Sequence, residues 1–363
     1  MSKTYPISLN RRHVLAGGLS AGAVTSGLTG PLFAADGKIK FGVGSNAWAP
    51  DFEGCLTGLS KIGFDGVEPF ATNIAPYRAD PAKLKAILDK TGLQLISCSS
   101  PVSPTATDFL DPTKADQVIK ENAEFARDFL RVFGCKHFKL TFGPRRGDTL
   151  MTTEQLKQLA ATMNELGRRT SEWGIKAAPH PSINSPIERE SELRAFMEMT
   201  DPRYVALVTD TGHLTLGGMD PAVIIRDYLP RIAEVHLKDV EGKYKGWTGP
   251  SYRDPRPYRM PGTANAGGVD YVDIYKLLKD RGYSGFVSLD IDGTDLTVPT
   301  IDLVKPNVRY LVETLKLPLK LQYSRRKSHV RQDACSDCCH YALERACLRA
   351  NCCSSCCRRC GSD

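Results

Sequence analysis

The 363-residue sequence lacks three features that would mark common classes of protein. After residue 35 no stretch approaches the ~18 consecutive apolar residues of a membrane-spanning helix, so we expect no membrane span there. No G-x-G-x-x-G motif follows the first expected strand, which weakens a doubly wound, dinucleotide-binding sheet, and we expect no nucleotide cofactor. The main part of the chain, residues 36–317, has no excess of basic over acidic residues.

The net charge of +7 belongs to the two ends of the chain. Residues 1–35 contain three basic and no acidic residues, giving +3. Residues 318–363 contain nine Lys/Arg and four Asp/Glu, giving +5. Residues 36–317 therefore carry −1, and this nearly neutral body argues against a nucleic-acid partner.

Cysteine is scarce in the body, which has only Cys55, Cys98 and Cys135 among the twelve of the chain. The other nine lie between Cys335 and Cys360, and several form C-x-x-C pairs with metal-ligand spacing. Disulfides are a second interpretation of this tail, residues 318–363. We favour a third, an undefined segment of low apolar content, and assign no ligand there.

The first 35 residues resemble a cleavable targeting segment. Arg11 and Arg12 precede a weakly apolar, Gly/Ala/Ser-rich run that reaches Ala35 without an acidic residue. Paired arginines before such a run are typical of a twin-arginine export signal. We therefore expect export to the periplasm, by a route that carries folded proteins with their cofactor in place.

From Lys38 onward, short β-branched runs alternate with longer amphipathic ones, as in a chain of βα units. Eight such units in residues 36–317 predict an α/β fold of the (β/α)8 TIM-barrel class. The expected strands are Ile39–Ser45, Gly66–Phe70, Leu93–Cys98, His137–Phe142, Ile175–His180, Val205–Thr211, Ile232–Lys238 and Gly285–Asp290. The expected final helix is Lys305–Leu315.

Strand alternation predicts which side chains point to the barrel axis. On the seventh strand Glu234, His236 and Lys238 share a face opposite Val235 and Leu237. Polar residues of the inward faces gather at the C-terminal strand ends, where barrel active sites form. Four of them, on strands five to eight, suit Mn, Co or Zn better than calcium. This expected metal set is His180, Asp210, His236 and Asp290.

Two strand motifs resemble those of the xylose isomerase-like sugar phosphate isomerase/epimerase superfamily, closest to its inosose dehydratase branch. They are D-T-G-H at Asp210–His213 and R-I-A-E-V-H-L-K-D at Arg231–Asp239. The resemblance covers residues 38–316 and implies a divalent metal held by the ends of strands five to eight. In the epimerases the ligands on strands five and eight are glutamates that also move the substrate proton; here they are His180 and Asp290.

The resemblance implies chemistry through an enediolate beside a carbonyl, with the proton moved by side chains near the metal. His213 resembles the family histidine that touches substrate oxygens. The expected catalytic residues are His180, His213, Asp290, Lys238 and Glu68. The expected substrate-binding residues are Trp48, His137, Lys139, Trp247, Arg253 and Arg259. Two of these residues have an alternative role. Trp48 could simply plug the barrel mouth, and Lys238 could neutralise Asp290 or Glu234.

We therefore expect a divalent-metal-dependent enzyme of the sugar isomerase/epimerase type. A dehydratase or lyase acting on a keto-inositol or 3-keto-glycoside is one alternative, and a non-catalytic carbohydrate-binding barrel is another. The partner is a small sugar, inositol or keto-glycoside. Whether a partner oxidoreductase first oxidises that substrate, and whether the chain forms an oligomer, stay open at this point.

Overall fold

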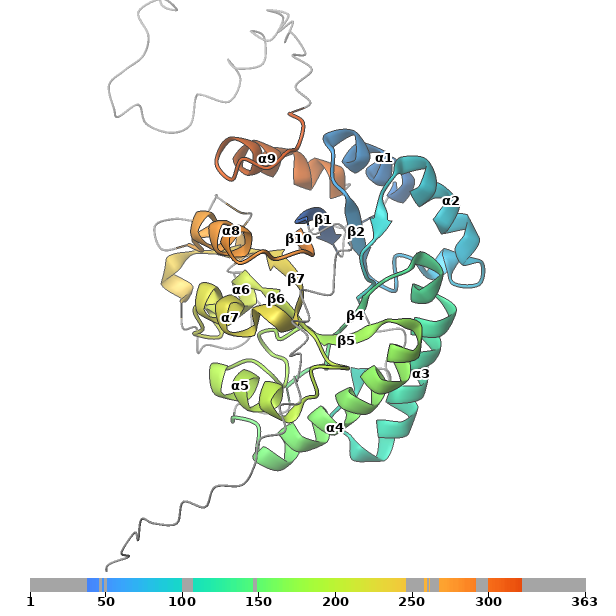
Figure 1. Ribbon diagram of the computed structural model, residues 1–363, viewed down its shortest axis with the longest axis vertical. Helices are drawn as coiled ribbons and strands as arrows, with labels where there is room; N and C mark the ends of the chain where they lie inside the picture. The colour runs from blue at the N-terminus through green and yellow to red at the C-terminus, as the bar shows by residue number, and fades with distance from the viewer. Residues whose placement is uncertain are drawn as a thin grey trace, which may run out of the picture. The chain divides into compact units, whose positions relative to one another are not determined.

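The computed structural model describes residues 38–45, 48, 51–99, 107–145, 149–245, 258–259, 261, 268–291 and 300–321. Residues 1–37 and 322–363 lie outside this part, so the export signal and the cysteine-rich tail remain predictions. In the described part, strands alternate with helices that surround them (Figure 1). None of these helices has the length and apolar character that crossing a membrane requires.

Eight parallel strands form the inner wall: β1 (Lys40–Ser45), β2 (Gly66–Pro69), β3 (Gln94–Leu95), β4 (His137–Leu140), β5 (Lys176–Pro179), β6 (Leu207–Asp210), β7 (Ile232–Leu237) and β10 (Phe286–Ile291). A short antiparallel pair, β8 (Asp239–Val240) and β9 (Tyr258–Arg259), follows β7. All eight expected parallel strands are present, several shorter than expected. The pair β8–β9 was not expected.

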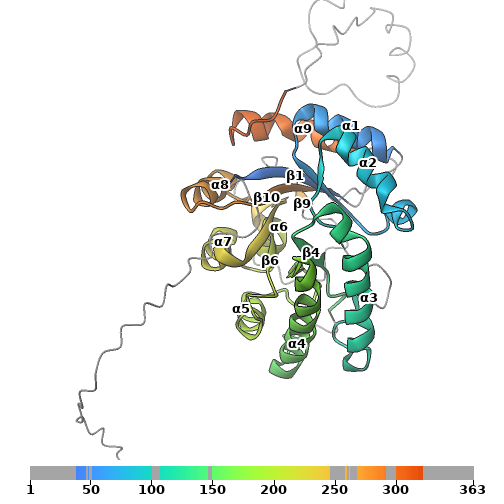
Figure 2. The same cartoon turned by 45° about the vertical axis from the view of Figure 1, so that its right-hand side comes forward.

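The outer ring consists of α1 (Phe52–Ile62), α2 (Pro81–Thr91), α3 (Ala115–Asp128), α4 (Thr153–Thr170), α5 (Glu190–Met199), α7 (Pro221–Tyr228), α8 (Tyr271–Asp280) and α9 (Thr300–Glu313). The shorter α6 (Thr211–Leu216) follows β6 directly. In Figure 2, α3 lies beside α4, and α1 lies between α2 and α9. The final helix starts five residues before the expected Lys305, because the buried face of α9 already begins at Thr300 and continues through Val304.

Closure of the sheet distinguishes a barrel from an open doubly wound sheet. The first strand, β1, pairs in parallel with the last, β10, from Lys40 opposite Phe286 to Ser45 opposite Ile291. The hydrogen-bonded order is β3-β2-β1-β10-β7-β6, and β4 pairs with β5. An isolated bridge between Ala177 and Val205 connects the two groups. The (β/α)8 prediction is confirmed.

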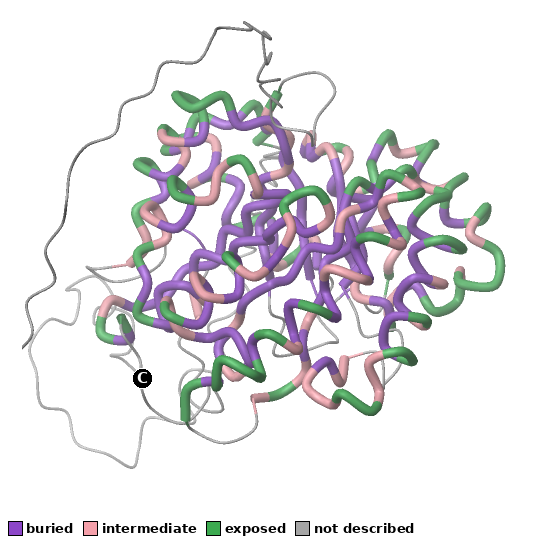
Figure 3. The backbone as a smooth tube through the Cα atoms, turned by 60° about the horizontal axis from the view of Figure 1, so that its bottom comes forward, coloured by how far each residue is buried: buried purple, intermediate pink, exposed green. Residues whose placement is uncertain are grey.

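The core follows from the two periodicities of the chain. Buried residues run along the strands, while the helices bury one face and expose the other (Figure 3). The helices begin and end at residues suited to those positions: Thr152 and Gln155 form a capping box at α4, and Gly63 ends α1 at φ 100°. Gly42 on β1 leaves room for two inward side chains, because a Cβ there would lie 2.3 Å from Ile96 Cδ1 and 2.5 Å from Ser288 Oγ and these side chains would have to shift.

One buried ion pair fastens the loops beyond β4 and β5. Both Glu192 oxygens accept hydrogen bonds from Arg145, at 2.7 and 3.0 Å, and Glu192 also accepts from the backbone N–H groups of Met151, Arg189 and Glu188. Burial alone would raise the pKa of Glu192, but these donors outweigh it and hold the pKa below its ordinary value.

Glu192→Gln should lower the free energy of unfolding by about 2–4 kcal/mol, because Arg145 is left buried without its charge partner. Denaturant titration at neutral pH measures this. Since the folded-state pKa of Glu192 is depressed, the difference between the two proteins should be full above about pH 4.3 and shrink as the pH falls below it. The matched control Glu165→Gln, on the partly exposed pair with Arg168 and Arg169, should cost at most about 1 kcal/mol.

Candidate metal centre

Four side chains from four different strand ends converge on the barrel axis. His180 follows β5, Asp210 ends β6, and His236 and Asp290 lie on β7 and β10. One ligand atom from each lies within 4.8 Å of the others, and all four residues are buried. Asp210 Oδ2 lies 3.8 Å from His180 Nε2, and His236 Nδ1 lies 3.3 Å from Asp290 Oδ2. The structure thus brings together the expected metal set.

Several of these atoms are buried without a hydrogen-bond partner: His180 Nε2, Asp210 Oδ2 and His236 Nδ1. Leaving such atoms unpaired costs about 1–3 kcal/mol each, so their convergence indicates a group that binds there. Two imidazoles and two carboxylates form a nitrogen–oxygen set that fits Mn²⁺, Co²⁺ or Zn²⁺. The residues present therefore fit a divalent cation.

The D-T-G-H motif explains how Asp210 is aimed. Its Oδ1 accepts the backbone N–H of His213 at 2.8 Å and begins α6, which leaves Oδ2 for the centre. Thr211 Oγ1 donates to the Lys238 carbonyl at 2.8 Å and accepts the Lys238 N–H at 3.0 Å, fixing α6 to the end of β7. At Gly212 a Cβ would lie 2.9 Å from the Lys238 side chain, so only glycine fits without a shift.

Lys238 places its ammonium against the two carboxylates of the set. Its Nζ lies 3.0 Å from Asp290 Oδ2 and 3.4 Å from Asp210 Oδ2. Burial would raise the pKa of each carboxyl, but the charge of Lys238 and the neighbouring histidines hold both below their ordinary values. Of the alternatives for Lys238, the structure places it on Asp290 rather than on Glu234.

His213 lies at the rim and contacts both the set and the β8–β9 pair. Its ring meets that of His180 edge to face, with centroids 5.4 Å apart. Its Nδ1 is 3.3 Å from the Ile183 N–H and 2.9 Å from the Tyr258 hydroxyl. Burial lowers the pKa of His213 to about 3. Because a backbone N–H donates to Nδ1, the neutral ring carries its proton on Nε2.

A second layer of buried polar side chains lies below the metal set, nearer the N-terminal ends of the strands. Glu68, expected to be catalytic, forms an ion pair with Lys139 and accepts the Ser99 hydroxyl at 3.2 Å. Glu234 Oε2 lies 3.0 Å from His137 Nε2, and its Oε1 accepts the Ser288 hydroxyl. His137 and Lys139, expected to bind substrate, thus lie beneath His236, on the side away from Lys238.

The other residues expected to bind substrate lie outside the metal centre or outside the described part of the chain. Trp48 is 1% exposed, donates its indole N–H to the Ser45 carbonyl at 2.7 Å and packs on Phe52, which favours the plug over a substrate wall. Arg259 forms an ion pair with Glu241 on the β8–β9 pair. Trp247 and Arg253 lie outside the described residues.

The sequence suggested Glu234 only as a possible partner of Lys238 and Tyr258 only as one aromatic residue of a loop that suits a sugar, and it gave no site role to Ser288. Strand alternation does place Glu234 and Ser288 inward, so that signal was present for both. No comparable signal exists for Tyr258, because its contact with His213 depends on the path of the long segment after β7.

Residues 56–314 match the family described as the xylose isomerase-like TIM barrel. This chain belongs to that family. Among named relatives of this xylose isomerase-like barrel, the inosose dehydratase of Clostridium tetani (strain Massachusetts / E88) is 28% identical over 282 residues, covering 70% of this chain and 90% of the relative. The inosose dehydratase of Lacticaseibacillus casei is 25% identical over 308 residues, covering 77% and 98%.

Solved structures show the same fold. The IOLI protein with a bound zinc atom aligns with a TM-score of 0.62 and 15% identity, covering 76% of this barrel's chain and 97% of that one. The 3-keto-D-glucoside 4-epimerase YcjR of E. coli, in its apo form, aligns with a TM-score of 0.57 and 17% identity, covering 75% and 99%.

Asp210→Asn should abolish metal binding and leave the fold intact, because asparagine also caps helices but supplies no anionic oxygen. Adding Mn²⁺ to the wild-type barrel should raise its Tm in proportion to the logarithm of the ion concentration once binding saturates, and the variant should show no rise. Mn²⁺ suits this test because it binds the thiolates of the cysteine-rich tail poorly.

The matched control is Asp220→Asn, which changes the capping residue of α7 outside the centre. It should respond to Mn²⁺ as the wild type does. Equal responses of Asp210→Asn and wild type would exclude this set as the binding site.

Proposed function

We propose that this protein is a divalent-metal-dependent dehydratase that removes water from a keto-inositol, with epimerisation of a keto-sugar as the second candidate. The buried set of two histidines and two aspartates at the strand ends carries this proposal. The similarity of most of the chain to relatives named inosose dehydratases supports the choice of dehydration. Both reactions start with removal of the proton beside a carbonyl.

A cation held by His180, Asp210, His236 and Asp290 would supply a Lewis acid that polarises a carbonyl oxygen and acidifies the neighbouring carbon. His213 then presents its Nε2–H to a substrate oxygen, since Tyr258 and Ile183 occupy Nδ1. This hydrogen bond would strengthen as negative charge develops on that oxygen.

Asp290 and Lys238 are proposed to move the proton. Asp290 takes the proton from the carbon, as the resemblance implies for the strand-eight position, and the C–H electron pair moves toward the carbonyl. The Lys238 ammonium gives a proton to the hydroxyl on the next carbon, which leaves as water while the carbon–carbon double bond forms. Because Lys238 Nζ is 3.0 Å from Asp290 Oδ2, the proton on Asp290 can return to Lys238 directly.

Lys238→Met should separate the two steps. In deuterated water the Mn²⁺-loaded variant should still exchange the proton beside the carbonyl of a keto-inositol, while loss of water falls about 10²–10⁴-fold. Proton NMR reports exchange, and ultraviolet absorption of the unsaturated ketone reports dehydration. Glu165→Gln is a control distant from the centre and should keep both rates.

Three outcomes would contradict part of this proposal. Exchange without water loss in the wild type would establish the epimerase candidate. Sugar binding without exchange would indicate a carbohydrate-binding barrel. Full activity of metal-free protein or of Asp210→Asn would remove the metal from the proposal.

Export also belongs to this proposal. We infer from the Arg11–Arg12 pair and the apolar run after it that the folded, metal-loaded protein reaches the periplasm. Replacing both arginines by lysine should keep the chain in the cytoplasm, as measured by cell fractionation with a tagged protein. Unchanged periplasmic delivery of the double variant would contradict the twin-arginine route.

A further inference from the structure

The His236 ring touches acidic groups on both sides, although only one ring nitrogen can face a metal held by the four-residue set. Its Nδ1 lies 3.3 Å from Asp290 Oδ2 and 4.0 Å from Asp210 Oδ2. Its Nε2 lies 3.5 Å from Glu234 Oε1 and 3.6 Å from Glu68 Oε2. His236 is fully buried, so its orientation depends on these acidic groups and on the side chains that pack around it, such as the His180 ring with its centroid 5.2 Å away.

The lower group of Glu68, Glu234 and His236 also has the composition of a small metal site. Each of its carboxylates, however, already has partners in the described structure. Lys139 forms an ion pair with Glu68, and His137 and Ser288 hydrogen-bond the two oxygens of Glu234. The Lys139 ammonium already balances the charge of Glu68, and the Glu68 oxygen and His236 nitrogen that have no hydrogen-bond partner lie 3.6 Å apart, so we treat this group as support for His236.

We propose that Glu234 and His137 are positioning residues for His236: Glu234 faces the Nε2–H, and His137 fixes Glu234 from the N-terminal side of the barrel. This inference rests on the proposed metal centre. Histidines that bind metals commonly donate their other N–H to a carboxylate, which fixes the tautomer and makes the ligand more basic. The arrangement turns Nδ1 toward Asp210 and Asp290.

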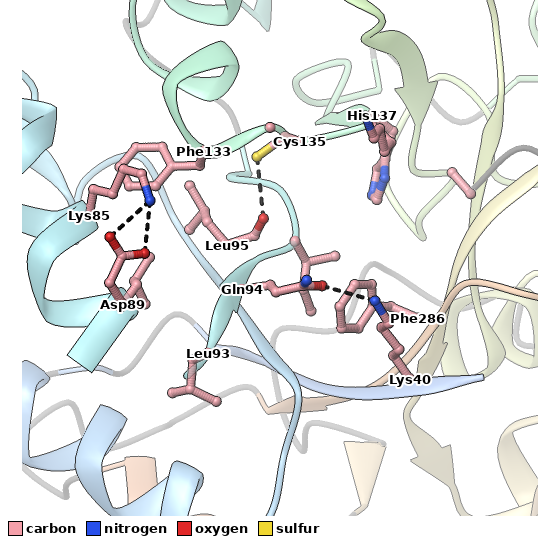
Figure 4. Close-up of a pocket in the computed structure, with 15 residues that line it drawn as sticks. Lys40, Lys85, Asp89, Leu93, Gln94, Leu95, Phe133, Cys135, His137 and Phe286 are labelled. Atoms are coloured by element: carbon pink, nitrogen blue, oxygen red, sulfur yellow. Dashed lines mark hydrogen bonds and ion pairs between the residues drawn. The ribbon is translucent and has the colours of Figure 1, made fainter. Parts of the chain in front are cut away.

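The N-terminal end of the barrel gives access to this support. A cavity of about 370 Å³ lies there, lined by residues at the starts of the strands, including Lys40, Gln94, His137 and Phe286 (Figure 4). His137 lines this cavity and also contacts Glu234, with its Nε2 3.0 Å from Glu234 Oε2. Removing its ring would extend the cavity to the Glu234 carboxylate.

The test measures binding of Mn²⁺ alone to the full chain, from the electron paramagnetic resonance signal of the unbound ion. Glu234→Gln and His137→Ala should each weaken binding about 10–100-fold and change the spectrum of the bound ion. The wild type should bind one ion in the barrel. For His137→Ala, added imidazole should enter the cavity and restore the affinity, while the wild-type affinity stays unchanged.

The matched control is Glu192→Gln, which also removes a buried carboxylate charge but lies outside the axis. It should lose stability and keep its Mn²⁺ affinity, which separates positioning from general destabilisation. Circular dichroism confirms folding, and His137→Gln replaces His137→Ala if the latter does not fold.

Wild-type Mn²⁺ affinity in Glu234→Gln and His137→Ala would overturn the proposal, as would two ions per wild-type barrel or failure of imidazole to act on folded His137→Ala. Wild-type affinity in Asp210→Asn would instead show that the metal centre, and with it the proposed function, is wrong.

Discussion

Burying four carboxylates on the axis of one barrel is the constraint on which the site depends. They are Glu68, Asp210, Glu234 and Asp290. Only two ammonium groups, Lys139 and Lys238, contact them among the described residues, so the missing positive charge equals that of one divalent cation. Burial and Lys139 would lower the pKa of His236, but the surrounding acids raise it well above its ordinary value, so a proton on this imidazole would supply one of the two missing positive charges.

The buried polar groups on the axis form two levels, an upper one at the C-terminal strand ends and a lower one beneath it. The upper level, at the strand ends, holds three atoms without hydrogen-bond partners, His180 Nε2, Asp210 Oδ2 and His236 Nδ1. In the described part of the lower level only Glu68 Oε2 and His236 Nε2, which face each other, are in that state. In the lower level Lys139, Ser288 and His137 occupy the carboxylates, which suits a rigid support. His236 belongs to both levels and connects them through its two ring nitrogens.

Much of the candidate site could be predicted because, in a closed barrel, the alternation of residues along each strand determines which side chains point to the axis. Alternation on β7 and β10 is enough to put His236 and Asp290 on the axis, and strand ends of a closed parallel barrel must meet. Alternation does not reveal height along the axis, so His137 and Lys139 were assigned to substrate although they lie beneath His236. Long-range loop contacts such as Tyr258 on His213 leave no periodic signal at all.

Backbone hydrogen bonding is not uniform around the barrel wall, and this affects where the wall opens locally. Among the described residues no backbone ladder joins β3 to β4; side-chain bonds, such as Lys139 N–H to Ser97 Oγ at 2.9 Å, cross there instead. Local opening costs least where few backbone hydrogen bonds must break. His137 and Lys139 both belong to β4, on one side of this gap, so fluctuations that widen it would loosen the support under the candidate metal centre before the whole barrel unfolds.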